Sequence, residues 1–254
     1  LVGHYWRQDE DEMPRLTTIA FDADDTLWHS EGFYREVHGH FETILGQYID
    51  IGNANVHDHL LEVERANIKL FGYGAKGMTL SMLETAVAMT AERISAHHLH
   101  EIIQLGKEVL NHPVELLDGI VDAVAEVARE YQVVLITKGD LFHQESKVAR
   151  SGLSSLFGRI EIVSEKDPVT YRRVLSEFGL QPQQFLMVGN SLNSDVAPVL
   201  HVGGFAVHVP YPLTWALDHH EGFIADDERM RTVESSAQIP VAVRELALKA
   251  ARFH

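Results

Sequence analysis

The stretch FDADDTLWHS, residues 21–30, follows the apolar residues Ile19 and Ala20 and places three carboxylates within four positions. A short apolar run of this kind is typical of a buried strand. A strand that ends in Asp22, Asp24 and Asp25 concentrates negative charge where burial is costly. Something must therefore compensate the charge of these three carboxylates.

Other short apolar runs predict strands that feed helices. Beyond the first strand at 17–22, such runs lie at 133–136, 185–188 and 205–209, with a weaker one at 160–163. Segments with helical periodicity separate them, and one of these stops at Gly179. Buried strands that alternate with helices predict an α/β fold with a Rossmann-like, doubly wound parallel sheet.

The connection between the first two strands is far longer than a crossover needs. After the strand at 17–22 no comparable run appears before Val133, although a crossover requires only about a dozen residues. Residues 30–113 are mostly helical in pattern, so we predict an inserted α-helical cap there. The core would comprise 17–29 and 114–254, and 1–16 would form a loose N-terminal extension.

Composition limits the ligand class. The 254 residues include 21 Lys and Arg against 37 Asp and Glu, for a formal net charge of −16. This charge argues against a broad hold on nucleic acid or on anionic membranes. No apolar run approaches the roughly 20 residues that cross a bilayer, and cysteine is absent, as suits a reducing compartment. We expect a cytoplasmic protein with a small or cation-bound ligand and no membrane partner.

Polar side chains follow four of the predicted strands. In an open α/β sheet, ligands bind beyond the carboxyl ends of the strands. Carboxylates, a hydroxyl, lysines and an amide that meet there predict a site for a phosphoryl group and a divalent metal ion. The residues concerned are Asp22 and Asp24, Thr137 and Lys138, Lys166, and Asn190 and Asp195.

These segments occur in the order of a known set of motifs. FDADDT resembles the DxDxT signature of the haloacid dehalogenase superfamily, and Thr137, Lys166 and GNSLNSD (189–195) resemble its second, third and fourth motifs. A helical insertion just after the first motif resembles the type 1 cap of that superfamily. The resemblance implies a hydrolase that uses Mg²⁺, and a helical cap over the crevice suggests a small phosphorylated metabolite as substrate.

The resemblance gives the first two aspartates different roles. Asp22 would attack phosphorus and form an aspartyl-phosphate. Asp24, two residues on along an extended segment, points to the same side and would protonate the leaving group, then deprotonate the hydrolytic water. The acid role predicts a raised pKa for Asp24, from the charge of Asp22 and partial burial. Asp25 is expected to point away from the phosphate and to have a structural or capping role.

The remaining motif residues would bind the metal ion and the phosphoryl group. A carboxylate that approaches a phosphate needs cations to offset the repulsion. Lys166 would supply a positive charge and Thr137 would bind phosphoryl oxygens, while Lys138 is a rival for the lysine role and a further substrate-binding candidate. The implied Mg²⁺ ligands are the Asp22 carboxylate, the Asp24 carbonyl oxygen and the side chains of Asn190 and Asp195.

Two features separate reactions within the superfamily. Its dehalogenases lack an acid at the position of Asp24, so Asp24 favours a phosphatase. Asn190 stands where the family usually has an acid after Gly, which predicts weaker metal binding. Two alternatives remain open: a dehalogenase-type hydrolase, and a catalytically weak relative that binds a phosphorylated ligand or a partner protein.

Some further features are open to two interpretations. The segment FGYGAKGMT, 71–79, is an ordinary helix connection or a substrate-sensing loop, with Lys76 as a substrate-binding candidate. Trp28 could wall the site or simply pack. The histidines include close pairs such as His57 and His59, but helix residues two apart do not share a face. We therefore expect solvated histidines rather than a metal site of their own.

Overall fold

The computed structural model of the chain describes residues 16–213 and 227–251. The predicted N-terminal extension, apart from Leu16, lies outside the described residues, as do the segments 214–226 and 252–254 that were assigned to the core. Within the described ranges, no helix is both long enough and apolar enough to cross a membrane.

A six-stranded parallel sheet forms the centre of the fold, with strand order β3-β2-β1-β4-β5-β6. β1 pairs with β2 on one side and β4 on the other, so that Phe21 lies opposite both Leu135 and Val188. The strand order therefore reverses beside β1, which is where open α/β sheets bind ligands. The strands are β1 (Thr18–Phe21), β2 (Gln132–Lys138), β3 (Arg159–Val163), β4 (Phe185–Gly189), β5 (Phe205–His208) and β6 (Met230–Thr232).

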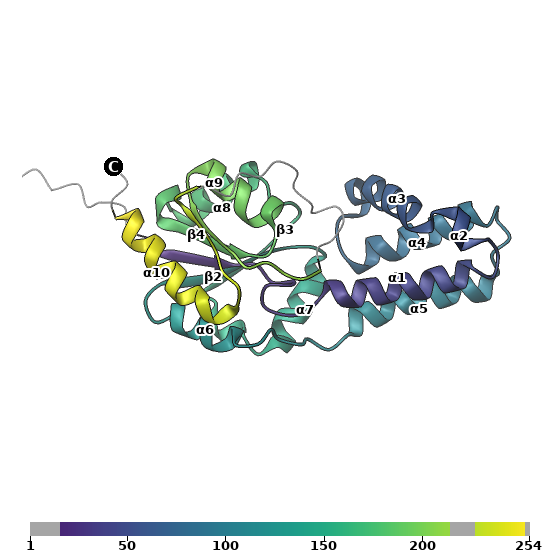
Figure 1. Cartoon of the computed structure of the whole chain (residues 1–254), viewed down its shortest axis with the longest axis horizontal. Helices are drawn as coiled ribbons and strands as arrows, with labels where there is room; N and C mark the ends of the chain where they lie inside the picture. Colours follow the sequence, from purple (N-terminus) through teal and green to yellow (C-terminus); the bar gives the residue numbers. More distant parts are fainter. Residues whose placement is uncertain (1–15, 214–226, 252–254) are drawn as a thin grey trace, which may run out of the picture.

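Helices cover both faces of the sheet, as the α/β prediction requires. Figure 1 shows α8 and α9 on one side of the strands and α6 and α10 on the other. Alternate residues of β1 serve the two faces: Ile19 and Phe21 belong to one apolar cluster and Ala20 to another. The helices around the sheet are α6 (Ile120–Val127), α7 (Leu141–Ser151), α8 (Pro168–Phe178), α9 (Ala197–Val202) and α10 (Ile239–Ala250).

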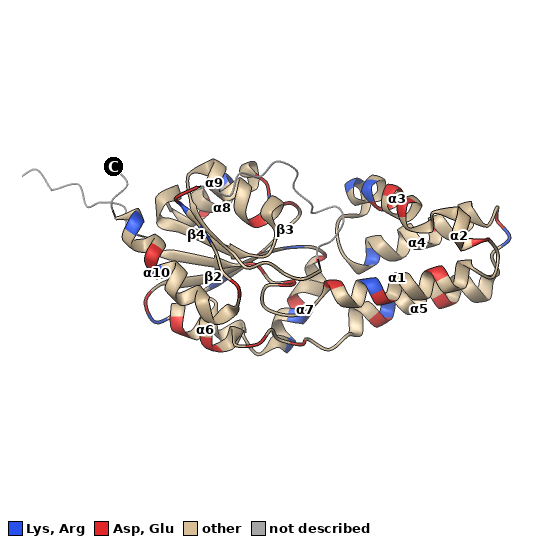
Figure 2. Cartoon of the chain, viewed as in Figure 1, with Lys and Arg blue, Asp and Glu red and all other residues tan. Residues whose placement is uncertain are grey.

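The long connection after β1 is helical. Its helices extend away from the sheet in Figure 1 and pack around an apolar cluster of their own, centred on Phe41, Met82 and Ile102. In Figure 2, Lys and Arg are dispersed among acidic residues on these helices and on the part that contains the sheet. The helices are α1 (Glu31–Leu45), α2 (Ile51–Ala54), α3 (Val56–Phe71), α4 (Ala75–Met89) and α5 (Ala96–Asn111). The division into domains at residues 30 and 113 stays a prediction.

The predicted loop at 71–79 is wrong in extent. α3 ends at Phe71 and α4 begins at Ala75, so only three residues connect them and Lys76 lies in the first turn of α4. Gly72 and Gly74 make this short connection possible, because both adopt positive φ angles, +75° and +102°, that favour glycine. Gly77 is helical and lies close to the carbonyl oxygen of Gly72.

Helices α4 and α5 approach closely at Gly106. A Cβ atom added at Gly106 would overlap the hydroxyl of Thr79 and lie 2.9 Å from its Cγ2 atom. Gly39 in α1 offers the contrast, since it is exposed and an added Cβ would meet nothing within 4 Å. The same substitution should therefore have opposite effects at these two helical glycines.

We expect Gly106→Ala to lower the free energy of unfolding by about 1–3 kcal/mol, because the helices must separate to admit the methyl group. Gly39→Ala should raise it by about 0.5–1 kcal/mol, because alanine loses less conformational entropy in a helix. Urea denaturation of both variants tests this, and equal effects at the two sites would contradict the close α4–α5 contact.

Candidate active site

The predicted site residues gather at the carboxyl edge of the sheet. Asp22 directly follows β1, and its N–H donates to the carbonyl oxygen of Val188 in β4, at 2.9 Å. A cavity of about 170 Å³ opens here, and the helices α1, α3 and α4 contribute to its walls. Its lining includes the predicted residues Asp22, Asp24, Thr137, Lys138, Lys166, Asn190 and Asp195.

A buried ammonium group joins two of the aspartates. Lys166 Nζ donates to Asp22 Oδ1 at 2.5 Å and to Asp195 Oδ1 at 2.7 Å. The three residues are 3%, 7% and 0% exposed, so water screens these charges little. Lys166 thus compensates part of the negative charge at the acidic end of β1.

Burial dominates the protonation of this cluster. It raises the pKa of Asp22 to about 7, against the attraction of Lys166 and with added repulsion from Asp195. Burial alone would lower the pKa of Lys166, but the charges of Asp195 and Asp22 outweigh it and raise that pKa above its ordinary value. Lys166 therefore stays charged at neutral pH, whereas Asp22 gains or loses its proton near pH 7.

The turn after β4 fixes Asp195. Asp195 Oδ2 accepts a hydrogen bond from the N–H of Ser191 at 3.0 Å, and Ser191 Oγ accepts one from the N–H of Ser194 at 3.0 Å. The carboxylate lies so close to Gly189 that a Cβ atom there would overlap it. Asn190 faces the same cavity, and its Oδ1 accepts a hydrogen bond from Thr26 Oγ1 at 3.2 Å.

Asp24 has different neighbours from Asp22. Its Oδ1 accepts from Lys147 Nζ at 2.5 Å and from Trp28 Nε1 at 2.7 Å, and its Oδ2 accepts from Gln144 Nε2 at 2.8 Å. Burial favours a raised pKa, but the charge of Lys147 and these three hydrogen bonds outweigh it and lower the pKa of Asp24 to about 2. The expectation of a raised pKa for Asp24 is therefore wrong for this conformation.

Sequence reasoning missed Gln144 and Lys147, the two α7 residues that contact Asp24. Both lie on α7, three residues apart and hence on one helix face, directly after the end of β2. Their spacing behind the polar turn at Gly139 and Asp140 was the available signal. Trp28, 1% exposed, packs in the core and also orients Asp24, and it is not among the residues that line the 170 Å³ cavity.

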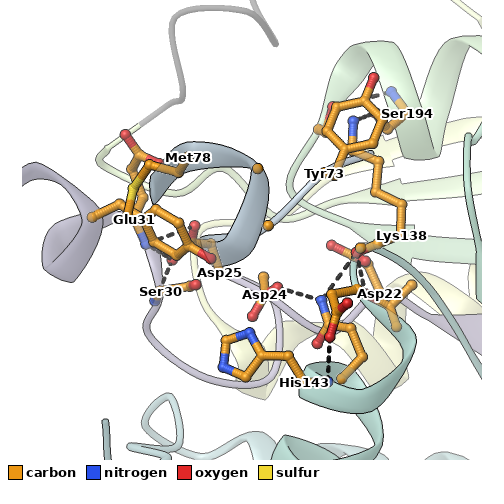
Figure 3. A pocket seen from close by; sticks show the side chains of 18 of the residues that line it. Asp22, Asp24, Asp25, Ser30, Glu31, Tyr73, Met78, Lys138, His143 and Ser194 are labelled. Atoms are coloured by element: carbon orange, nitrogen blue, oxygen red, sulfur yellow. Dashed lines mark hydrogen bonds between the residues drawn. The ribbon is translucent and has the colours of Figure 1, made fainter. Parts of the chain in front are cut away.

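Asp25 has the capping role that the sequence predicted, but it also lines the cavity, which was not expected of a residue that points away from the phosphate. It adopts φ +60°, and its Oδ1 accepts hydrogen bonds from the N–H groups of Ser30 at 2.8 Å and Glu31 at 3.1 Å, at the start of α1. Figure 3 shows these contacts at one side of the cavity, with Asp24 between them and Asp22. Burial raises the pKa of Asp25 to about 7, and the charge of Asp24 adds to this effect.

The two other lysine candidates lie apart from the buried cluster. Lys138 Nζ donates to Ser194 Oγ at 2.9 Å and lies 4.6 Å from the ring centre of Tyr73. Lys76 is not among the lining residues: its half-exposed ammonium contacts both carboxylate oxygens of Asp140 at 2.9 Å. Tyr73 Oη donates to Glu165 Oε2 at 2.6 Å, so the α3–α4 connection contacts the rim of the core.

The histidines follow the solvated expectation in part. His40, His57, His59, His97 and His100 are exposed, whereas His38 and His98 are half-buried. The pair His219 and His220 lies outside the described residues. Over residues 16–213 and 227–251, no group of three or more His, Asp or Glu side chains converges as a metal site.

Comparison with known proteins gives a consistent family. Residues 16–203 match the family model of haloacid dehalogenase-like hydrolases. The chain is 24% identical to a glyceraldehyde 3-phosphate phosphatase of Pyrococcus furiosus, over 78% of this chain and 82% of that relative. It is also 24% identical to a glyceraldehyde 3-phosphate phosphatase of Methanothermobacter thermautotrophicus, over 81% of this chain and 90% of that relative. A solved haloacid dehalogenase-like family hydrolase from Xanthomonas campestris is 51% identical, with a TM-score of 0.85 and coverage of 96% of this chain and 97% of that one. The chain belongs to the haloacid dehalogenase-like hydrolase family.

Proposed function

We propose that this protein is a Mg²⁺-dependent phosphatase that hydrolyses phosphate monoesters of small metabolites through an aspartyl-phosphate at Asp22. The observation that carries the proposal is the buried contact of Lys166 with Asp22 and Asp195 at the sheet's carboxyl edge. The relatives named as phosphatases support a phosphate ester rather than a halide as substrate. The acid at position 24 supports the same choice, because departure of an alkoxide needs a proton and departure of a halide does not.

The donor groups at this edge fit a hard divalent cation. Mg²⁺ prefers oxygen ligands, and the carboxylates of Asp22 and Asp195, the carbonyl of Asp24 and the amide oxygen of Asn190 would hold it. Asp22 and Asp195 together carry more negative charge than Lys166 balances when both are ionised, which favours an added cation. A bound Mg²⁺ would neutralise charge between the nucleophile and the phosphate.

The nucleophilic step belongs to Asp22. One carboxylate oxygen forms a bond to phosphorus while the ester oxygen leaves with the electron pair of its P–O bond. Lys166 holds the carboxylate in place and its charge offsets the approaching phosphoryl oxygens. Thr137, buried at the end of β2, supplies a hydroxyl to those oxygens. Water then attacks phosphorus, releases phosphate and restores Asp22.

The proton transfers belong to Asp24. It gives a proton to the departing ester oxygen and takes one from the attacking water. In the structure Lys147 favours the ionised form of Asp24, which suits the second step. An incoming phosphate brings like charge to the same cavity, and like charge raises the pKa of a carboxyl group. Substrate binding therefore prepares Asp24 for the first step.

The walls of the cavity favour a small substrate. The cavity has a volume of about 170 Å³, and residues from α1, α3 and α4 line it together with the motif residues. We propose that residues 30–113 form a cap over a core of 17–29 and 114–254. Such a cap excludes water from the reacting groups, which strengthens their electrostatic interactions.

Asp22→Asn should reduce phosphatase turnover by at least about 10³-fold, because an amide cannot act as the nucleophile. Steady-state hydrolysis of p-nitrophenyl phosphate measures the loss, and mass spectrometry of acid-quenched enzyme tests for a phosphoryl adduct in the wild type only. The matched control is Asp118→Asn at an exposed position. Turnover of Asp22→Asn at the control's rate would refute the aspartyl-phosphate route.

Asp24→Asn should slow hydrolysis of alkyl phosphates by about 10²–10⁴-fold, since an alkoxide needs a proton to leave. Hydrolysis of p-nitrophenyl phosphate should fall less, because its phenolate is a better leaving group. The ratio of kcat/KM for the two ester types, measured in both proteins, is the relevant quantity. An unchanged ratio would remove Asp24 from the acid role.

Asn190→Asp should lower the Mg²⁺ dissociation constant on the order of tenfold, or about 1.4 kcal/mol, by adding an anionic ligand. Titration calorimetry measures this without turnover, while kcat should stay the same or fall because the new charge repels phosphate. Asn193→Asp is the matched control, on the same turn but outside the cavity lining. Equal Mg²⁺ affinity in the two variants would mean that Asn190 is not a ligand.

A further inference from the structure

The cavity continues beyond the reacting groups toward the helices that follow β1. Its far end is lined by Glu31, Tyr34 and His38 of α1, Glu64 and Ile68 of α3, and Met78 of α4. In Figure 3, Glu31 and Met78 lie across the cavity from Asp22 and Lys138, with Asp24 between. The leaving group of a phosphate ester held at Asp22 would occupy this far end.

Two side chains at this end have unused hydrogen-bonding capacity. The side chain of Glu64 is only 7% exposed, yet its Oε2 has no hydrogen-bond partner among the described residues. His38 Nε2 also lacks one there, and it lies 3.7 Å from Glu64 Oε1, beyond hydrogen-bond distance. An unsatisfied buried carboxylate oxygen costs free energy, so this pair favours a ligand that supplies a donor.

We propose that His38 and Glu64 bind a hydroxyl group of the leaving alcohol, so that the substrates are phosphate esters of polyols. The inference rests on the proposed phosphatase function and adds the class of alcohol. A hydroxyl both donates and accepts, so it can donate to the Glu64 carboxylate and accept from His38 in the tautomer that carries its N–H at Nε2. An oxygen about 2.8 Å from both His38 Nε2 and Glu64 Oε1, which lie 3.7 Å apart, makes both contacts, and a neighbouring hydroxyl of the same polyol can donate to Glu64 Oε2.

The charges around the pair disfavour an acidic leaving group. Glu31 lines the same end, and its partner Arg35 is exposed and 3.3 Å away. Half-buried Tyr34 also lines the cavity, and burial first and then the charges of Asp24, Glu31 and Glu64 raise the pKa of its hydroxyl. A carboxylate on the leaving group would meet like charge here. An ammonium group would leave the His38 N–H without an acceptor.

The test compares esters that differ only in the leaving group. 2-Hydroxyethyl, glycerol and erythritol phosphates are each paired with the alkyl phosphate of equal chain length, and phosphoglycolate and phosphoethanolamine provide the acid and the amine. At the best chain length we expect kcat/KM for the polyol ester to exceed that for the alkyl ester by at least about tenfold. The kcat/KM for 2-hydroxyethyl phosphate should also exceed the values for phosphoglycolate and phosphoethanolamine.

Glu64→Gln keeps the shape of the side chain and removes its charge, so it should lower the polyol-to-alkyl ratio of kcat/KM about tenfold. Glu62→Gln makes the same change at an exposed position of α3 and should leave the ratio as in the wild type. Circular dichroism of both variants reports whether they fold, and the wild-type ratios test the proposal without any variant.

The outcomes separate this inference from the proposed function. Equal rates for polyol and alkyl esters at every length, a preference for the acid or the amine, or the same ratio in Glu64→Gln and Glu62→Gln would each overturn the hydroxyl site. If p-nitrophenyl phosphate is still hydrolysed, the phosphatase function stands in those cases. If the protein hydrolyses none of these esters, including p-nitrophenyl phosphate, both the hydroxyl site and the phosphatase function are overturned.

Discussion

The contact of the Lys166 ammonium with Asp22 and Asp195 is the interaction on which the arrangement of the site depends. It ties the end of β1 to the turn after β4 and to the segment that leads from β3 into α8, all within a region that water hardly reaches. Removing one partner of a buried ion pair costs about 3–5 kcal/mol, because the other charge is left uncompensated. The position of Asp195 also requires glycine at residue 189, because its carboxylate occupies the space that a Cβ atom would need. The sheet order makes this possible, since β1 lies between β2 and β4 and brings residues distant in sequence to one edge.

Asp22 and Asp24 show how environment separates two like residues. Burial raises the pKa of Asp22 to about 7, whereas Lys147 and three hydrogen bonds lower that of Asp24 to about 2 despite burial. The proposed roles, Asp22 as nucleophile and Asp24 as general acid, require the opposite order of pKa values at the moment of reaction. Positive charge added beside Asp22 lowers its pKa, and a phosphate beside Asp24 raises that residue's pKa. In the proposed mechanism, Mg²⁺ and the substrate phosphate would therefore shift both pKa values toward the order that the reaction needs.

Local pattern predicted the parts of the fold that depend on burial alone. The apolar runs at 133–136, 185–188 and 205–209 became β2, β4 and β5, and the weaker run at 160–163 became β3. β6 was missed because its three residues, Met230–Thr232, contain a single apolar side chain and offer no run. Among site residues, those next to strand ends could be placed from sequence, because parallel strands end at one edge. Gln144 and Lys147 could not, since their contact with Asp24 depends on the direction in which α7 leaves β2. The expectation of a raised pKa for Asp24 was wrong for the same reason. The sequence shows that Asp22 is close to Asp24, but it does not show that Lys147 contacts Asp24.

The two ends of the cavity have different hydrogen-bonding chemistry, and this difference constrains how a substrate can bind. At the sheet edge the ammonium groups of Lys166 and Lys138 and the hydroxyl of Thr137 offer donors to phosphoryl oxygens beside the carboxylates of Asp22, Asp24 and Asp195, whose charge a bound cation would offset. The far end offers the carboxylates of Glu31 and Glu64 and the ring nitrogen of His38. A phosphate ester of a neutral alcohol can satisfy both ends in only one orientation, because its phosphate is repelled from the far end. Its leaving oxygen then lies between the ends, where Figure 3 places Asp24. The same charges that would orient the substrate thus bring the bond to be broken next to Asp24, the residue proposed to transfer the proton.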